Sequence, residues 1–387
     1  MTKIICFAVA LYSCLAFAKT GLTYFDQYSE NKNEFLRLSA RVPTNKWLVL
    51  NDQWAINADP NLTTNVAVFK QLKIKSETLL VFSSGIHGVE GFVGSALQRW
   101  FLEENLIAKK SLNVDLAMLH SLNPWGMQNK RRVSAENIDL NRNFSDSDSI
   151  FSKTNDDYMK IDSFLNPQEK LRLGFFHRAS FLFDSVRLIL KYSIETLRKS
   201  ILLGQNQQPR GLYYAGTAAT PLKAKIDSFM AEVIKDYKKI IWIDLHTGYG
   251  TKGKLHLLAN DSKSIAGEEL RKQFKSTPID FGDQKNFYKT DGDLVSYLAR
   301  FNQPDHLVTA VVFEYGTLDS QTTLGSMESL RRMLIENQAY QNGATSSEAS
   351  VQANALFYEM FIPKEEVWVQ QILNQTESAL LNLNLVR

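Results

Sequence analysis

Short apolar runs alternate with stretches of helical periodicity along most of this chain, and this alternation limits the folds open to it. Apolar runs bounded by polar or turn residues predict buried strands. They occur at Asn65–Phe69, Thr78–Ser84, Val114–Leu119, Lys239–Leu245, Lys254–Ala259 and Leu307–Glu314. Helical spacing of apolar residues predicts helices at Gly94–Ala108, Pro221–Tyr237, Asp293–Phe301, Leu324–Tyr340 and Glu366–Leu381. Strands alternating with helices predict an α/β protein whose sheet is flanked by helices.

One stretch, residues 145–235, has helical but no strand pattern. Ser145–Asp157 is polar and predicts a loop, and Gln168–Leu203 predicts one or two helices. We expect their buried side chains to be Phe175, Phe176, Phe181, Phe183, Val186, Leu188 and Leu190. A chain of 387 residues has room for two or three domains at roughly 150 residues each. We nevertheless interpret residues 19–387 as a single domain that carries a helical insertion.

The N-terminus has the pattern of an export signal. Lys3 precedes the apolar run Ile4–Phe17, and Ala16-Phe17-Ala18 is a small-residue cleavage signal. We predict that residues 1–18 are removed and that the protein is periplasmic or secreted. A buried N-terminal helix and a lipoprotein signal ending at Cys14 are the alternatives. No later segment has about 18 consecutive apolar residues, so we predict no integral membrane segment in the mature chain.

Two histidines lie where predicted strands end. His87 and Glu90 belong to Ser84-Gly-Ile-His87-Gly-Val-Glu90-Gly91, and His246 belongs to Ile243-Asp-Leu-His246-Thr-Gly248. Ligands of open α/β sheets collect outside the carboxyl ends of strands, so these three side chains can meet at one edge. Two histidines and a glutamate are a common ligand set of catalytic zinc. The alternatives are a helix N-terminal turn and a core histidine bonded to the backbone.

The remaining histidines have no carboxylate at a useful spacing, and we expect them to be structural. They are His120, His177, His256 and His306. The two cysteines both lie in the N-terminal apolar segment. A metal in the mature chain would therefore be held by histidine and carboxylate.

A carboxylate closes another apolar run, Val311-Val-Phe-Glu314-Tyr-Gly-Thr317. Burying a charge without a partner is costly, so we expect Glu314 at the open end of its strand. There it can accept a proton from a water that zinc activates. The alternative is a charge that simply emerges from the sheet.

A further motif, Arg131–Phe144, is rich in groups that bind anions. Guanidinium groups capture carboxylates in a bidentate manner, so Arg132 and Arg142 with Asn141 can form a clamp. The alternative is a solvated basic loop.

The order of these motifs resembles that of the zinc metallocarboxypeptidases, the carboxypeptidase A-like family. The matching residues are His87-x-x-Glu90, Arg132, Asp139-Leu-Asn141-Arg142-Asn-Phe144, His246 and Phe313-Glu314. The resemblance extends over roughly residues 75–320 and is closest to a bacterial branch with His-Gly-Val-Glu-Gly and Phe-Glu-Tyr-Gly-Thr. It implies a mixed, mostly parallel central sheet flanked by helices.

The resemblance also implies a role for each residue of the catalytic centre. His87, Glu90 and His246 would hold one Zn²⁺ ion. Glu314 would act as general base and then as general acid, and Arg132 would polarise the scissile carbonyl.

For the substrate, the resemblance implies that Asn141 and Arg142 hold a terminal carboxylate. Tyr288 matches the family's mobile tyrosine, with a surface-loop tyrosine as the alternative. Asp291 and Asp293 point to recognition of a basic side chain, unless they cap a helix.

These expectations favour a zinc-dependent hydrolase that cleaves an amide bond near a free carboxylate, as a carboxypeptidase acting on peptides does. The alternatives are an aspartoacylase-like deacylase of N-acyl amino acids and a catalytically inactive binding module. The chain has 44 Lys and Arg against 41 Asp and Glu, which argues against a dedicated binder of nucleic acid or of membrane surfaces. The oligomeric state stays open.

Overall fold

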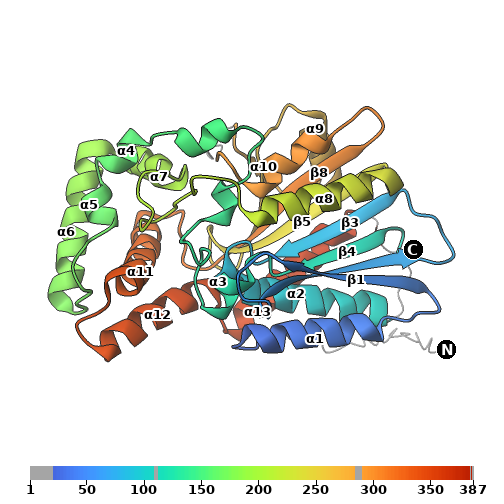
Figure 1. The fold of residues 1–387 in the computed structure, drawn as a ribbon, viewed down its shortest axis with the longest axis horizontal. Coiled ribbons are helices and arrows are strands. Elements are labelled where there is room, and N and C mark those ends of the chain that lie inside the picture. The colour runs from blue at the N-terminus through green and yellow to red at the C-terminus, as the bar shows by residue number, and fades with distance from the viewer. Residues whose placement is uncertain (1–20, 109–111, 284–289, 384, 386–387) are drawn as a thin grey trace, which may run out of the picture.

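The protein folds around one eight-stranded sheet in the computed structural model, which describes residues 21–108, 112–283, 290–383 and 385 (Figure 1). The strand order is β1-β2-β4-β3-β5-β8-β6-β7. The strands are β1 Trp47–Ala55, β2 Thr63–Gln71, β3 Thr78–Ser84, β4 Asp115–His120, β5 Lys239–Gly248, β6 Leu255–Ala259, β7 Ile279–Phe281 and β8 Leu307–Gly316.

The centre of the sheet is parallel and its flanks are mixed. β4, β3, β5 and β8 run parallel to one another, whereas β2 pairs antiparallel with β4 and β6 pairs antiparallel with β8. The mixed sheet flanked by helices is the predicted fold class, and that prediction is confirmed. Because parallel strands end at the same edge, β3, β5 and β8 bring their carboxyl ends together.

Helices cover both faces of the sheet. Successive residues of a strand point to opposite faces, so Leu80 and Phe82 of β3 join one apolar core while Leu79 and Val81 join another. The first core includes side chains of α1 Tyr28–Arg41, α2 Gly91–Phe101 and α13 Glu366–Leu381. The second includes side chains of α8 Pro221–Asp236 and α10 Leu294–Leu298. Burial on both faces explains why β3, β5 and β8 are apolar runs without alternation.

The longer helices agree closely with the predicted ones where a buried face creates a clear period. The α-helices are α1 Tyr28–Arg41, α2 Gly91–Phe101, α3 Pro124–Gln128, α4 Asp156–Met159, α5 Asp162–Leu165, α6 Phe175–Tyr192, α7 Ile194–Leu202, α8 Pro221–Asp236, α9 Ile265–Gln273, α10 Leu294–Leu298, α11 Thr323–Asn342, α12 Ser347–Phe361 and α13 Glu366–Leu381. The segment predicted as a loop, Ser145–Asp157, contains the 3-10 turn η4 Asp148–Ser152 and the start of α4.

The chain between β4 and β5 is helical, and its described residues add no strand to the sheet. Its helices α4 to α7 stand beside the sheet, next to α11 (Figure 1). Phe181 and Leu188 of α6 are buried as predicted. The prediction is wrong for five residues that are exposed, Phe175, Phe176, Phe183, Val186 and Leu190. They lie on the side of α6 that faces away from the rest of the insertion, so no described residue covers them.

Candidate metal centre and active site

The turn after β3 places His87 and Glu90 at the carboxyl edge of the sheet. His87 precedes the 3-10 turn η1 Gly88–Glu90, which leads directly into α2. A Cβ atom at Gly88 would lie 2.2 Å from the carbonyl carbon of Gly126, so only glycine lets this turn pack against α3. His246 lies within β5, where it is paired in register with Glu314 of β8. All four side chains are buried.

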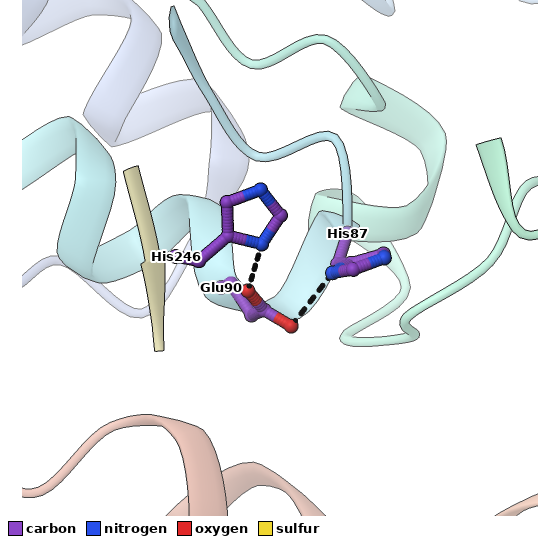
Figure 2. A group of neighbouring side chains, drawn as sticks. All are labelled: His87, Glu90 and His246. Carbon is purple, nitrogen blue, oxygen red and sulfur yellow. Dashed lines mark hydrogen bonds and ion pairs between the residues drawn. The ribbon is translucent and has the colours of Figure 1, made fainter. Parts of the chain in front are cut away.

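Both imidazole rings direct the same nitrogen toward one carboxylate (Figure 2). His87 Nδ1 lies 2.9 Å from Glu90 Oε1, and His246 Nδ1 lies 3.0 Å from Glu90 Oε2. Candidate ligand atoms of the three residues all lie within 4.8 Å of one another. This is the predicted cluster, and it can hold a metal ion.

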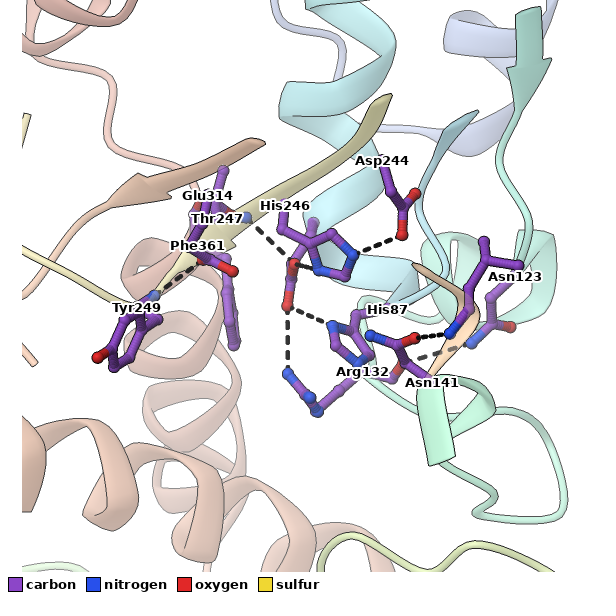
Figure 3. Close-up of polar contacts among 12 residues, drawn as sticks. His87, Asn123, Arg132, Asn141, Asp244, His246, Thr247, Tyr249, Glu314 and Phe361 are labelled. Atoms are coloured by element: carbon purple, nitrogen blue, oxygen red, sulfur yellow. Dashed lines mark hydrogen bonds and ion pairs between the residues drawn. The ribbon is translucent and has the colours of Figure 1, made fainter. Parts of the chain in front are cut away.

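The opposite ring nitrogens are held by two further carboxylates. His87 Nε2 lies 3.1 Å from Asp139 Oδ1. His246 Nε2 lies 2.7 Å from Asp244 Oδ2, a contact that Figure 3 shows. If each Nε2–H donates to its carboxylate, each neutral ring presents an Nδ1 lone pair to Glu90. The two Nδ1 lone pairs and the Glu90 carboxylate are then three acceptors with no proton between them. A cation bound among them removes the repulsion between their lone pairs. His87 Nδ1 is buried without a hydrogen bond, as expected for a ligand atom. The donor set therefore fits zinc.

The charges of this cluster are strongly coupled. Burial alone would raise the pKa of Glu90, but His87 and His246 bring it well below its usual value. Burial alone would likewise raise the pKa of Asp139, yet Arg132 and His87 keep it well below its usual range. Two acidic side chains, Glu90 and Asp139, are thus held as anions beside the two histidines.

Glu314 differs from these acids in its surroundings. Its Oε1 accepts a hydrogen bond from the backbone N–H of Tyr249 at 2.9 Å, and only 7% of the residue is exposed. Burial, followed by the negative charge of Glu90, raises the pKa of Glu314 to about 8. Such a carboxyl group can take up and release a proton near neutral pH, as the predicted role requires.

Arg132 reaches the same carboxylates from the loop that precedes η3 Leu140–Arg142. Its Nη1 donates to Glu90 Oε1 at 3.2 Å and its Nε donates to Asp139 Oδ2 at 3.1 Å. Its guanidinium carbon lies 5.2 Å from the ring centre of Tyr213. No described residue accepts a hydrogen bond from Nη2, so this group can donate to a substrate.

Asn141 and Arg142 belong to η3, which Asp139 caps by accepting from the backbone N–H of Asn141 at 3.1 Å. Asn141 Oδ1 accepts from the N–H of Leu294 at 2.9 Å, so its Nδ2 group is the one left to donate. Arg142 Nε donates to the carbonyl of Leu202 in α7 at 2.8 Å. Both predicted clamp residues therefore lie in the site, and the helical insertion holds one of them.

One cavity of about 290 Å³ is lined by most of these groups. The predicted residues that line it are His87, Glu90, Arg132, Asn141, Arg142, His246 and Glu314. Its walls also include Tyr213, Tyr249 and Arg198, together with apolar side chains such as Val295 and Val312. Tyr288, the remaining predicted residue, lies outside the described residues.

The two aspartates proposed to recognise a basic side chain have other partners. Asp293 caps α10 by accepting from the N–H of Ser296 at 2.8 Å, and it accepts from Asn260 at 3.0 Å. Asp291 is exposed and pairs with Lys153 at 2.7 Å. The helix-cap alternative is correct for Asp293, which lines the cavity, and Asp291 does not line it.

Two carboxylates that contact the cluster were assigned no role from the sequence, Asp139 and Asp244. Asp244 also accepts from Ser83 at 2.6 Å, and Ser83 accepts from Trp242 at 2.7 Å. A usable signal was present, because residues two apart on a strand share a face and Asp244 lies two before His246. Asp139 gave no such signal, since a turn brings it to His87 from far along the chain.

Fold and site together define the class, an α/β protein with a buried His–Glu–His cluster that can hold a metal ion at the carboxyl edge of its sheet. The family described as "Protein of unknown function (DUF2817)" matches residues 24–375, and the chain belongs to that family. No curated protein matches the chain.

Several solved structures are similar to this chain at low identity. Bovine thrombin-activatable fibrinolysis inhibitor, solved with tick carboxypeptidase inhibitor, is 13% identical with a TM-score of 0.46, over 91% of this chain and 98% of that chain. Carboxypeptidase A from Helicoverpa armigera is 11% identical with a TM-score of 0.44, over 88% and 74%. Succinylglutamate desuccinylase from Chromobacterium violaceum is 13% identical with a TM-score of 0.39, over 81% and 74%. Such values carry no argument about activity, which must come from the site.

Proposed function

We propose that this protein is a zinc-dependent hydrolase that cleaves an amide bond near a free carboxylate, and that it removes C-terminal residues from peptides. One observation carries the proposal. A single cavity holds the His87–Glu90–His246 cluster, the protonatable Glu314 and the side chains of Asn141 and Arg142. Metal ligands, a proton carrier and a carboxylate clamp are the three parts that this reaction needs.

The residues of the chain divide the work of hydrolysis. Zinc, when bound by His87, Glu90 and His246, supplies Lewis acidity that lowers the pKa of water and polarises a carbonyl oxygen. Glu314 takes a proton from the attacking water and passes it to the leaving amine. Arg132 Nη2 donates to the oxygen on which negative charge develops, a contact worth about 3–4 kcal/mol.

Binding of the substrate carboxylate falls to the clamp. Arg142 provides a fixed positive charge, because its Nε donates to the carbonyl of Leu202 and its Nη1 donates to the carbonyl of Asn141. Asn141 adds a donor whose direction Leu294 fixes. A carboxylate held here positions the amide near Glu314, which converts binding energy into proximity.

A second candidate function is the removal of an acyl group from an N-acyl amino acid. It is favoured by a third guanidinium in the same cavity, that of Arg198 on α7. Arg198 is anchored by Ser326 at 3.2 Å and by the carbonyl of Ser320 at 3.1 Å. Three cationic side chains around one cavity suit a small substrate with more than one carboxylate.

Product analysis separates these functions. The zinc-loaded protein would be incubated with a mixed library of peptides and N-acyl amino acids, and the products identified by mass spectrometry. Loss of one C-terminal residue supports the carboxypeptidase. Released acyl groups with intact peptides contradict it in favour of the deacylase. Stoichiometric zinc without any product would instead indicate a binding module.

We also propose that the protein is exported, on the strength of its N-terminal sequence. Export would place its substrates outside the cytoplasm. N-terminal sequencing of protein made with its own N-terminus should find Lys19 first. A chain that starts at Met1 would contradict export by cleavage, and a lipid-modified Cys14 would show the lipoprotein alternative.

A further inference from the structure

Helix α6 of the insertion exposes a continuous apolar face. Six large apolar side chains form this face, Phe175, Phe176, Leu182, Phe183, Val186 and Leu190. Their exposed fractions range from 42% for Leu182 to 86% for Phe176. At 3.6 residues per turn these positions fall within a sector of about 120° on an 18-residue helix. Soluble proteins rarely expose so many clustered aromatic and aliphatic side chains without a partner.

The opposite side of α6 anchors the helix to the protein. Phe181 and Leu188 are buried, and the ring of Phe181 stacks on Phe164 with 5.4 Å between ring centres. The helix is therefore held in place by its buried side, and the apolar face is additional to that packing. In Figure 1, α6 is the outermost helix at the left of the molecule, beside α5, and its apolar face is exposed.

Cationic side chains border the face on both sides. At helical spacing Arg178 lies along one edge, and Arg187 and Lys191 lie along the other. The acidic residue of this helix, Asp184, already pairs with Arg187 at 3.3 Å. No described residue forms an ion pair with Arg178 or Lys191, and both side chains are exposed.

We propose that this face of α6 binds the surface of an anionic phospholipid bilayer. Helices with phenylalanine and leucine on one side and cations beside them lie in the plane of the interface, with rings among the acyl chains and cations at the phosphates. No helix in the described ranges is long and apolar enough to cross a bilayer. The overall charge of +3 concealed this feature, because it averages a local cationic border over the whole chain.

A second copy of the chain fits this face less well. Two α6 helices packed face to face, in either direction, would bring cationic edges against cationic edges. Asp184 cannot offset this repulsion without giving up Arg187. An anionic bilayer satisfies the same cations and covers the same apolar side chains, so it is the occupant that charge complementarity favours.

Docking through α6 would also orient the active site. Helix α7 follows α6 after Ser193, and its Arg198, Ile201 and Leu202 line the cavity. A bilayer bound by α6 would therefore lie beside the helix that forms one wall of the cavity. The bilayer proposal itself does not depend on the hydrolytic activity.

Vesicle co-sedimentation of the purified protein tests the proposal. Vesicles of phosphatidylglycerol and phosphatidylcholine should bind the protein, and phosphatidylcholine vesicles should bind it at least about tenfold more weakly. Phe176→Ser with Phe183→Ser should lower the partition coefficient about tenfold or more, because two exposed rings lose their acyl contacts. Raising the salt from about 0.05 M to about 1 M should also weaken binding.

A matched control removes exposed apolar side chains elsewhere. Leu324 on α11 and Val367 on α13 are 77% and 70% exposed, so Leu324→Ser with Val367→Ser should leave vesicle binding unchanged. Circular dichroism would check that both double variants remain folded. Failure to bind anionic vesicles at low salt would overturn the proposal, as would equal binding by the Phe176 and Phe183 variant. A dimer that this variant dissociates would show that a second copy covers the face instead.

Discussion

Two regions at the same edge of the sheet hold histidines whose pKa values are shifted in opposite directions. His120 ends β4, whereas His246 lies near the end of β5, and β3 separates these strands. Around His120 the contacts are with Ser95 Oγ at 2.8 Å and with the ring of Phe35, 4.8 Å between centres. Burial, aided by the charge of Arg99, lowers the pKa of His120 to about 3.

Around His246 burial acts in the same direction, yet Asp244 and Glu90 raise the pKa of His246 well above its usual value. Both histidines are thus buried near the end of a strand, but only His246 has carboxylate neighbours. A cation site at this edge therefore depends on the carboxylates that orient the imidazoles and attract a cation, more than on the presence of histidine. Each of the following changes tests that difference.

The largest expected effect belongs to Glu314→Gln. Without a proton acceptor beside the cluster, kcat/KM should fall roughly 10²–10⁴-fold, while zinc content stays at the wild-type level. Steady-state kinetics with parallel metal analysis would show this. Zinc lost together with activity would argue that Glu314 serves as a ligand rather than as the general base.

Arg132→Met tests whether a donor beside the cluster stabilises the transition state. We expect kcat/KM to fall roughly 10²–10³-fold, because one preorganised donor to the developing charge is removed. Arg131→Met offers the comparison, since Arg131 binds Glu336 at 2.7 Å instead. Stability should fall in that variant because Glu336 loses its partner, but kcat of the folded fraction should stay near wild type. Equal kinetic losses in both variants would contradict a specific role for Arg132.

Asp244→Asn asks how much one supporting carboxylate contributes. Loss of its charge should weaken zinc binding roughly 10–100-fold, because His246 Nε2–H loses its anionic acceptor. Competition titration with a chelator would measure the change. Asp115→Asn is the control, since this buried carboxylate contacts Tyr237 at 2.8 Å and lies at the other end of β4. Similar affinities in the two variants would refute the role given to Asp244.

His120 should reveal itself through the pH dependence of stability. Its folded pKa of about 3 lies below the unfolded value of about 6.5, so the unfolded chain binds more protons between these values. The free energy of unfolding should therefore decrease as pH falls from about 6.5, by about 2 kcal/mol at pH 5 from this residue. His120→Gln should remove that share of the acid dependence in urea titrations. An unchanged pH profile would show that His120 does not titrate as inferred.

The sequence predicted those elements whose two faces are both buried or whose ends carry chemistry. It did not predict β1 and β7, because β1 is an edge strand with four consecutive exposed residues and β7 is only three residues long. The metal cluster was predictable because strand ends converge at one edge. The support from Asp139 was not, since a distant turn provides it. The exposed face of α6 was mispredicted because periodicity identifies an apolar face but not what covers it.

Metal stoichiometry tests the central claim most directly. Purified wild-type protein, His246→Gln and His120→Gln would each be loaded with zinc, desalted and measured by inductively coupled plasma mass spectrometry. We predict one zinc ion per chain for wild type and for His120→Gln, and none for His246→Gln. Stoichiometric zinc in His246→Gln, or none in the wild-type protein, would contradict a metal centre formed by His87, Glu90 and His246.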